Sequence, residues 1–220
     1  MPQKSSNLDA LVKKIENMIL TGVFRPREHL VETDLASRLN VSRYAVRDAL
    51  KILETKGLVQ ITPYKGATVK DLSKKEIEDI FVIRVQLERL ALRLALKNIR
   101  PEDIDRLEEL ADRFEEAYEK RDIEAMIQTN SRFHDAMFEL ADNPVLFQLI
   151  VDLRTRLYIV RYASWSSPGV LQTILQEHRE FLKAFREKDV AKLDELAERH
   201  LAHAKERYLA QLEAVEAFAH

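Results

Sequence analysis

Three histidines in the C-terminal two thirds of the chain carry the side chains best suited to hold a metal ion. His134, His178 and His200 each have apolar residues three and four positions away, which places each on the apolar face of a different predicted helix. Asn130 precedes His134 by four residues, so both side chains can point at one spot. Imidazole nitrogens and an amide oxygen suit zinc, nickel, manganese or iron(II). The spacing indicates a transition-metal site.

The alternative interpretation of these histidines stays open. An inward-facing histidine is often a hydrogen-bonded core residue, and the sequence does not show that the three rings meet. His203 lies one turn after His200. It could replace His200 as a ligand, hold it in place, or lie at the surface.

An enzymatic use of the histidines finds little support. His134-Asp135 is the dipeptide of HD-type phosphohydrolases, but these enzymes need an earlier metal-binding histidine. The only earlier one, His29, lies in the basic N-terminal segment. The chain has no Glu-x-x-His pair, no glycine-rich phosphate loop and no cysteine. We therefore expect no enzyme, and a helical metal-dependent hydrolase remains the alternative function.

The elements that carry the histidines have helical periodicity, and Gly169 is the only glycine beyond residue 66. In the first of them Ile77, Ile80, Phe81, Leu87, Leu90, Ala91 and Leu94 are expected to face inward. The capping-box spacing of Ser73 and Glu76, together with Pro101, Asp122 and Pro144, marks helix starts. The pattern predicts a bundle of six helices, approximately at residues 73–97, 101–120, 122–141, 144–163, 170–187 and 189–212.

The N-terminal segment has a different organisation. Thr33 is expected to cap a short helix, and Ser42 a second one that buries Val46, Leu50 and Leu53. Two alternating stretches, 59–61 and 67–69, then predict a hairpin. This order is typical of a winged helix-turn-helix, whose second helix lies in the major groove of DNA. A generic helical pair with a hairpin is the alternative.

The charge is distributed unevenly between the two parts of the chain. Residues 1–70 hold 12 Lys+Arg and 7 Asp+Glu, a net of +5, whereas residues 71–220 hold 23 and 30, a net of -7. A basic head favours a polyanionic partner. Neither a signal peptide nor a run long enough to span a bilayer is evident, so we expect a cytoplasmic protein that does not enter a membrane.

The head resembles the N-terminal domain of GntR-type bacterial transcription regulators. The match runs through DALVKKIENMIL, GVFRPREHLVETDLASRLNVSRYAVRDALKILETKGLV and the wing PYKGATV, about the first third of the chain. One departure is Tyr44-Ala45, where the family usually has Thr-Pro. The resemblance implies binding to double-stranded DNA through Thr33, Ser42, Arg43, Tyr44, Arg47, Lys65 and Gly66.

The bundle looks like the FCD ligand-binding domain of the same family. The resemblance rests on Ile83–Glu88, Asn130–His134, Asp142–Pro144, Glu177-His178 and His200, and it covers nearly all of 72–210. It implies that Asn130, His134, His178 and His200 bind a divalent metal, with a small carboxylate beside it. Asn130 stands where the subgroup usually has Asp, which leaves more of the metal's charge uncompensated.

For the effector, the resemblance points to Arg84, because a guanidinium pairs with a carboxylate. A salt bridge to Glu88, four residues on, is the alternative role for this arginine. Arg156 and Tyr158 are further candidates.

Together these features predict a mainly α protein with a winged helix-turn-helix at residues 1–70 and an FCD-like domain for metal, effector and dimerisation at 71–220. We expect a transcriptional regulator that binds an inverted-repeat operator as a homodimer. A repressor is the expected role, because repressors are more common in this family. A bundle whose metal is purely structural is the other possibility.

Overall fold

The computed structural model describes residues 3–157 and 169–218. It divides into two compact units. The first contains Met1–Ser73 with Arg154–Tyr162, and the second contains Lys74–Leu153 with Ala163–His220. The boundary between Ser73 and Lys74 falls three residues after the expected one, which was placed between residues 70 and 71.

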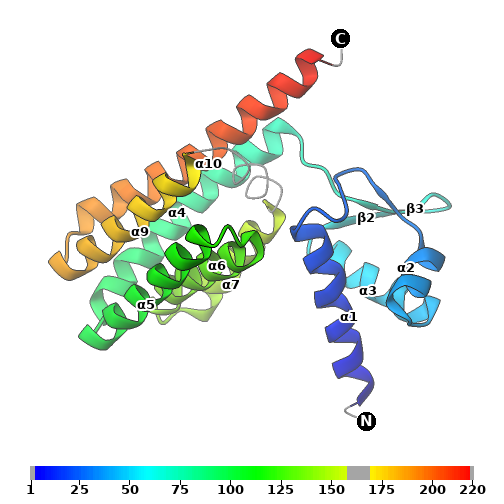
Figure 1. The fold of residues 1–220 in the computed structure, drawn as a ribbon, viewed down its shortest axis with the longest axis horizontal. Coiled ribbons are helices and arrows are strands. Elements are labelled where there is room, and N and C mark those ends of the chain that lie inside the picture. The colour runs from blue at the N-terminus through cyan, green and yellow to red at the C-terminus, as the bar shows by residue number, and fades with distance from the viewer. Residues whose placement is uncertain (1–2, 158–168, 219–220) are drawn as a thin grey trace. The chain divides into compact units, whose positions relative to one another are not determined.

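The first unit is a helical head with a small antiparallel sheet (Figure 1). The three strands have the order β1-β3-β2, and β2 and β3 form the predicted hairpin, with Ile61 opposite Ala67. The pairing of His29 and Leu30 as a third strand was not predicted, because two residues are too short for a recognisable alternation. The elements are α1 (Gln3–Leu20), β1 (His29–Leu30), α2 (Glu32–Leu39), α3 (Arg43–Thr55), β2 (Val59–Thr62) and β3 (Gly66–Val69).

Helix α3 is held by the apolar face that the sequence predicts. Val46, Leu50 and Leu53 are at most 1% exposed. They pack in a core with residues of α1, including Ile15 and Ile19, which are fully buried. Because one face of α3 is fixed in this way, the opposite face stays available at the surface.

The start of α3 is capped as predicted, whereas the start of α2 is not. The Ser42 hydroxyl oxygen accepts a hydrogen bond from the Ala45 N–H at 3.2 Å. At α2 the cap position is Val31, which offers no side-chain hydrogen bond. Thr33 lies inside the first turn, and its hydroxyl is 3.3 Å from a carboxylate oxygen of Asp34. The prediction that Thr33 caps α2 was therefore wrong. Helix α2 starts at Glu32 and leaves Thr33 one residue too late to act as a cap.

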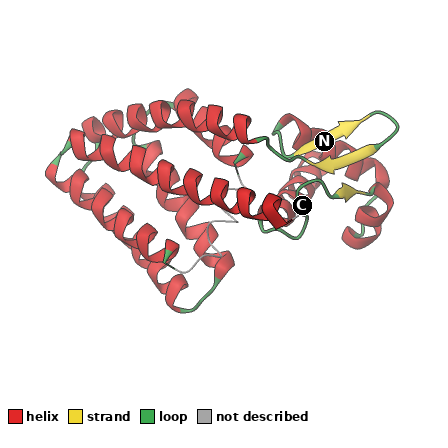
Figure 2. Ribbon diagram, turned by 90° about the horizontal axis from the view of Figure 1, so that it is seen from above, coloured by secondary structure: helices red, strands yellow, loops and turns green. Residues whose placement is uncertain are grey.

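Every regular element in the described part of the second unit is a helix, and Figure 2 shows the strands confined to the other unit. Asp122 caps α6 as predicted, with its carboxylate accepting from the Ala125 N–H at 3.0 Å. The predicted continuation of the fourth helix to residue 163 lies largely outside the described residues. The six described helices are α4 (Lys74–Asn98), α5 (Pro101–Glu119), α6 (Ile123–Glu139), α7 (Pro144–Arg156), α9 (Val170–Glu187) and α10 (Val190–Phe218).

The buried face of α4 differs from the predicted one at Leu90. Ile77, Phe81 and Ala91 are buried as expected, but Leu90 is 47% exposed. Glu88 precedes Leu90 by two residues, about 200° around the helix, and takes the buried face at 3% exposure. Pairing between its carboxylate and Arg84 makes this burial tolerable. None of the described helices is long and apolar enough to cross a membrane.

Candidate DNA-binding surface and metal centre

The first candidate surface is the N-terminal half of α3. Tyr44 is 78% exposed, and the side chains of Arg43 and Arg47 are 61% and 47% exposed. Arg47 also lies over the Tyr44 ring, with its guanidinium carbon 6.0 Å from the ring centroid. An exposed helix start with two guanidiniums and an aromatic ring has the side chains that contact phosphates and base edges in a major groove.

Glu32 holds Arg47, one of the two arginines of this surface, in a defined position. The Nε and Nη2 atoms of Arg47 donate to the two carboxylate oxygens of Glu32 at 2.9 and 2.7 Å. The hydrogen bond from Arg47 lowers the pKa of Glu32 below its ordinary value. Arg43 lies farther from the same carboxylate, at 3.9 Å. Glu32 thus orients the Arg47 guanidinium across the surface of α3 before any DNA is bound.

The wing tip presents a second set of exposed side chains. Tyr64 is fully exposed and has a left-handed φ of 64°. Gly66 follows with a φ of 85°, a conformation that glycine adopts without strain. A Cβ built on Gly66 would meet nothing within 4 Å. The glycine is therefore required by the backbone turn, and Lys65 between these two residues is exposed at the tip.

The three candidate metal-binding histidines come together in the second unit. The ring centroids of His134 and His200 are 4.8 Å apart, and those of His134 and His178 are 5.5 Å apart. The rings come from α6, α9 and α10, and the side chains of Phe133 and Phe181 pack against them. Both His134 and His178 are almost completely buried, at 5% and 1% exposure.

Asn130, the fourth candidate, lies against His178. Its amide oxygen is 3.1 Å from Nε2 of His178. Since an amide oxygen only accepts, Nε2 carries the hydrogen and Nδ1 holds the lone pair. Within the described chain, Nδ1 of His178 is buried without a hydrogen-bond partner. Burial, and to a lesser extent the nearby His200, holds the pKa of His178 well below 6.5. The ring is therefore neutral at pH 7, the form that binds metals.

Glu177 orients the remaining histidines. Its carboxylate oxygens lie 2.6 Å from Nδ1 of His200 and 3.0 Å from Nδ1 of His203. Burial opposes its ionisation, but the hydrogen bonds from His200 and His203 outweigh this, and the pKa of Glu177 is lowered. The ionised carboxylate only accepts, so both Nδ1 atoms carry hydrogens. In the neutral His200 ring, Nε2 is then left as the lone-pair nitrogen. His203 acts here as a partner of Glu177.

The spacing of these donors fits a single metal ion. With ligand atoms about 2.1 Å from a metal, two imidazole centroids lie about 4.6 Å apart at a right angle and about 5.3 Å apart at a tetrahedral angle. The centroid distances of 4.8 and 5.5 Å are close to these values.

The histidine nitrogens do not converge on one metal position in this structure. Among the described residues, no group of three or more His, Cys, Asp or Glu side chains has converging metal-ligand positions. The rings of His178 and His200 are turned towards Asn130 and Glu177. A small rotation of an imidazole moves its nitrogens without moving the backbone, so the spacing of the ring centroids is the feature on which the candidate centre rests.

Of the three candidate effector residues, the structure describes Arg84 and Arg156. Nε and Nη2 of Arg84 donate to one oxygen of Glu88 at 2.9 and 2.6 Å, which is the ion pair considered as the alternative role. The Arg84 guanidinium also lies 5.6 Å from the centroid of Phe81. Arg156 is exposed at the end of α7, in the segment that groups with the first unit. Tyr158 lies outside the described residues.

Comparison with known proteins accounts for both units. Residues 8–69 match the model of the bacterial regulatory proteins of the gntR family, and residues 79–203 match the FCD domain. The chain is 30% identical over 193 residues to the HTH-type regulator YdhC of Bacillus subtilis, covering 86% of this chain and 84% of that one.

The chain belongs to the GntR family, with an FCD domain.

Other relatives of this GntR protein extend the comparison. It is 26% identical over 188 residues to the HTH-type transcriptional repressor RspR of Escherichia coli, covering 86% of this chain and 82% of that one. Its fold matches the solved structure of McbR from E. coli, with a TM-score of 0.79 and 26% identity over 95% of this chain and 98% of that one. The relatives are transcription regulators, and GntR regulators bind DNA.

Two residues that contact candidate site residues of this GntR protein, Glu32 and Glu177, were not among the predicted site residues. Glu177 immediately precedes a candidate ligand, and a carboxylate beside an imidazole is a recurrent support for metal-binding histidines. Its position next to His178 was thus a usable signal. Glu32 carried no comparable signal, because its partner Arg47 lies fifteen residues away in another helix.

Proposed function

We propose that this GntR regulator is a repressor whose affinity for its operator is controlled by a small carboxylate bound beside a divalent metal in the FCD domain. The observation that carries the proposal is the short distance from the His134 ring to the rings of both His178 and His200. The repressor role draws on the likeness to RspR, which is named a transcriptional repressor.

In this proposal Asn130, His134, His178 and His200 hold zinc, nickel or manganese. When bound, the metal supplies a positive charge that attracts a carboxylate oxygen of the effector. Asn130 contributes an oxygen without a charge, so the ligand set is neutral and the charge of the metal remains available to an anion. Arg84 is the candidate for the other end of the effector, once its guanidinium exchanges Glu88 for the effector carboxylate.

Two copies of the chain would act together on DNA in the bacterial cytoplasm. One recognition helix reads few base pairs, and a twofold-related pair reads the two halves of an inverted repeat. The effector changes operator affinity only if it binds one arrangement of the two heads more tightly than the other. In a repressor of this kind, the effector-bound arrangement is the one that fits the operator less well.

The metal is tested by elemental analysis of protein purified without a nickel column. Wild type is expected to hold about one metal per chain, and His134→Ala and His178→Ala are expected to lose it. His29→Ala is the matched control, because His29 is exposed in the head. Metal retained in both bundle variants, or absent from wild type after incubation with each of the three metals, would overturn this part of the proposal.

The effector is tested by fluorescence anisotropy with a labelled operator. Small mono-, di- and tricarboxylates are titrated into the metal-loaded protein and into protein stripped with a chelator. The proposal expects at least one carboxylate to weaken operator binding in the loaded protein only. If metal is present and no carboxylate changes operator affinity, the metal is structural and the effector part of the proposal fails.

A further inference from the structure

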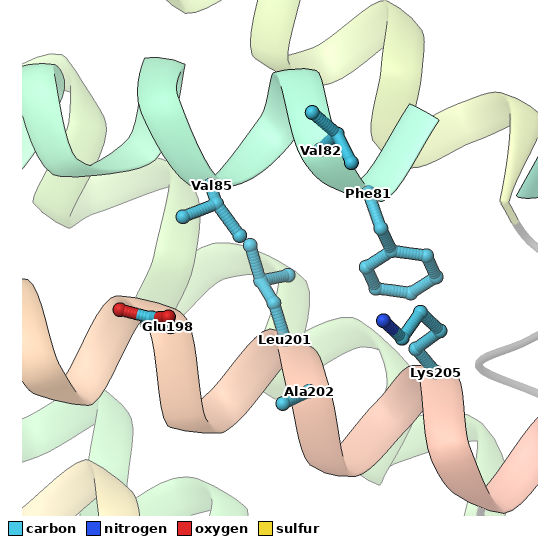
Figure 3. A pocket seen from close by; sticks show the side chains of 7 residues that line it. All are labelled: Phe81, Val82, Val85, Glu198, Leu201, Ala202 and Lys205. Atoms are coloured by element: carbon cyan, nitrogen blue, oxygen red, sulfur yellow. The ribbon is translucent and has the colours of Figure 1, made fainter. Parts of the chain in front are cut away.

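Exposed apolar groups occur in both units, but their neighbours differ. In the second unit, Phe81 and Val85 reach from α4 towards α10 in a hollow that is lined mostly by apolar side chains (Figure 3). In the first unit, the side chain of Tyr44 is exposed near the start of α3 and lies beside the guanidinium of Arg47. A ring and a guanidinium together provide apolar contact and directional hydrogen bonds. The surface of α3 is therefore the better suited of the two to distinguish one ligand from another.

Tyr44 and Arg47 lie on the same exposed face of α3. They are three residues apart, a spacing that makes two side chains neighbours on a helix, and the guanidinium carbon of Arg47 lies 6.0 Å from the centroid of the Tyr44 ring. Three residues span about 4.5 Å along a helix axis, and neighbouring base pairs lie about 3.4 Å apart. When α3 lies in a major groove, the two side chains therefore reach the same base pair or adjacent ones.

Glu32 occupies one edge of the Arg47 guanidinium. Nε and Nη2 of Arg47 donate to the Glu32 carboxylate at 2.9 and 2.7 Å. The planar guanidinium has five N–H donors in a fixed fork, and Nη1 with the second N–H of Nη2 forms a separate edge. The two parallel donors of that edge match O6 and N7 of a guanine, the commonest specific contact of an arginine in the major groove. Arg47 can thus bind a guanine while it keeps its hydrogen bonds to Glu32.

The ring of Tyr44 suits a different base. In the major groove thymine is distinguished by its C5 methyl group, which apolar side chains such as phenylalanine contact. Tyr44 is 78% exposed, so most of its ring surface is available to such a methyl group. Its hydroxyl offers a second kind of contact, because a tyrosine hydroxyl also donates to phosphate oxygens. The two contacts use different atoms of one side chain, and a change of single atoms separates them.

We infer that Tyr44 is a specificity-determining residue, whose ring contacts the methyl group of a thymine in the base pair next to a guanine bound by Arg47. The adjacency follows from the three-residue spacing of the two side chains on α3. The inference rests on the DNA binding of GntR regulators and is independent of the proposed metal and effector.

Selection from a random library of DNA duplexes tests the predicted base preference. The full-length wild-type protein should select a guanine with a thymine, on either strand, in the adjacent base pair. Tyr44→Ser should keep the guanine and lose the preference for thymine. Val23→Ser is the matched control, because Val23 is an apolar residue of the head that is 48% exposed outside α3. The same thymine preference in Tyr44→Ser and wild type would overturn the inference, as would a wild-type selection without thymine beside guanine.

Single-atom changes in the selected duplex then identify the groups in contact, with affinity measured by fluorescence anisotropy. Uracil in place of the thymine removes only the methyl group. It should weaken binding of wild type about fourfold, the effect of one buried methyl group, and should not weaken binding of Tyr44→Ser further. In the same way, 7-deazaguanine should weaken binding of wild type about tenfold or more, but not that of Arg47→Ala. Uracil at thymines elsewhere in the duplex is the control. Equal affinity of wild type for the thymine and uracil duplexes would overturn the contact.

Tyr44→Phe separates the ring from the hydroxyl. If the ring contacts the methyl group, this variant should keep both the wild-type affinity and the fourfold effect of uracil. A loss of affinity as large as that of Tyr44→Ser, without an effect of uracil, would assign the contact to the hydroxyl and a phosphate and overturn the inference. Helical content by circular dichroism should match wild type in both variants, because Tyr44 is exposed and makes no part of the head's core.

Discussion

The carboxylate of Glu177 accepts hydrogen bonds from Nδ1 of His200 at 2.6 Å and from Nδ1 of His203 at 3.0 Å. With only 3% of its surface exposed, Glu177 is among the most buried charged residues of the described chain. This contact fixes which nitrogen of His200 carries the hydrogen and leaves the lone pair of the neutral ring on Nε2. A buried carboxylate in this position supports the candidate metal centre without being one of its ligands.

Replacing Glu177 with Gln should weaken metal binding about 10–100-fold, the usual effect of losing a residue that orients a ligand. The amide keeps one acceptor oxygen but turns an N–H₂ group towards the second Nδ1–H, so one histidine loses its orientation. Competition with a chromophoric chelator measures the affinity. Glu195→Gln, at an exposed carboxylate on α10, is the control. Equal metal affinity in Glu177→Gln and wild type would remove the positioning role.

Replacing Asn130 with Asp should raise metal affinity roughly tenfold, since a negative oxygen replaces a neutral one at the candidate centre. Without metal, the same change should lower the thermal midpoint, because it places a charge at a site that is 6% exposed. Calorimetry with and without zinc separates the two effects. The difference in thermal midpoint between the zinc-loaded and metal-free forms should therefore be larger in Asn130→Asp than in wild type. An equal difference in the two proteins would speak against Asn130 as a ligand.

Replacing Arg47 with Ala should weaken operator binding while leaving helical content unchanged. If Arg47 contacts a phosphate, the loss should be similar for all sequences, and the slope of log affinity against log salt should fall by about one. If it reads a base, the loss should be about 1–3 kcal/mol and confined to the cognate operator. Lys183→Ala, at an exposed cation on α9, is a charge-matched control. Unchanged operator affinity would show that α3 does not bind DNA through Arg47.

Replacing Ser42 with Ala should destabilise the head by about 1 kcal/mol, because the Ala45 N–H loses its side-chain acceptor. Thr33→Ala is the matched comparison. Since Thr33 lies inside α2 and does not cap it, its loss should cost less than about 0.5 kcal/mol. Chemical denaturation monitored by circular dichroism gives both values. Equal destabilisation by the two changes would contradict the assigned cap of α3.

Local patterns predicted the elements that carry the two candidate sites. Hydrophobic spacing located α3 through Val46, Leu50 and Leu53, and the caps Ser42 and Asp122 fixed two helix starts. These features depend on neighbours three or four residues away, which the sequence displays directly. The same local rule failed at Leu90, because the buried face of α4 depends on which helices pack against it and on the ion pair that buries Glu88.

The sequence by itself determined that the chain has a winged helix-turn-helix head, a helical bundle, and histidines on apolar helix faces. Only the tertiary structure decided that His134, His178 and His200 meet, that Glu177 holds two histidines, and that Glu32 orients Arg47. Periodicity gives the face of a helix on which a residue lies. The partner of that face depends on how helices far apart in the sequence pack, and no local pattern records that packing.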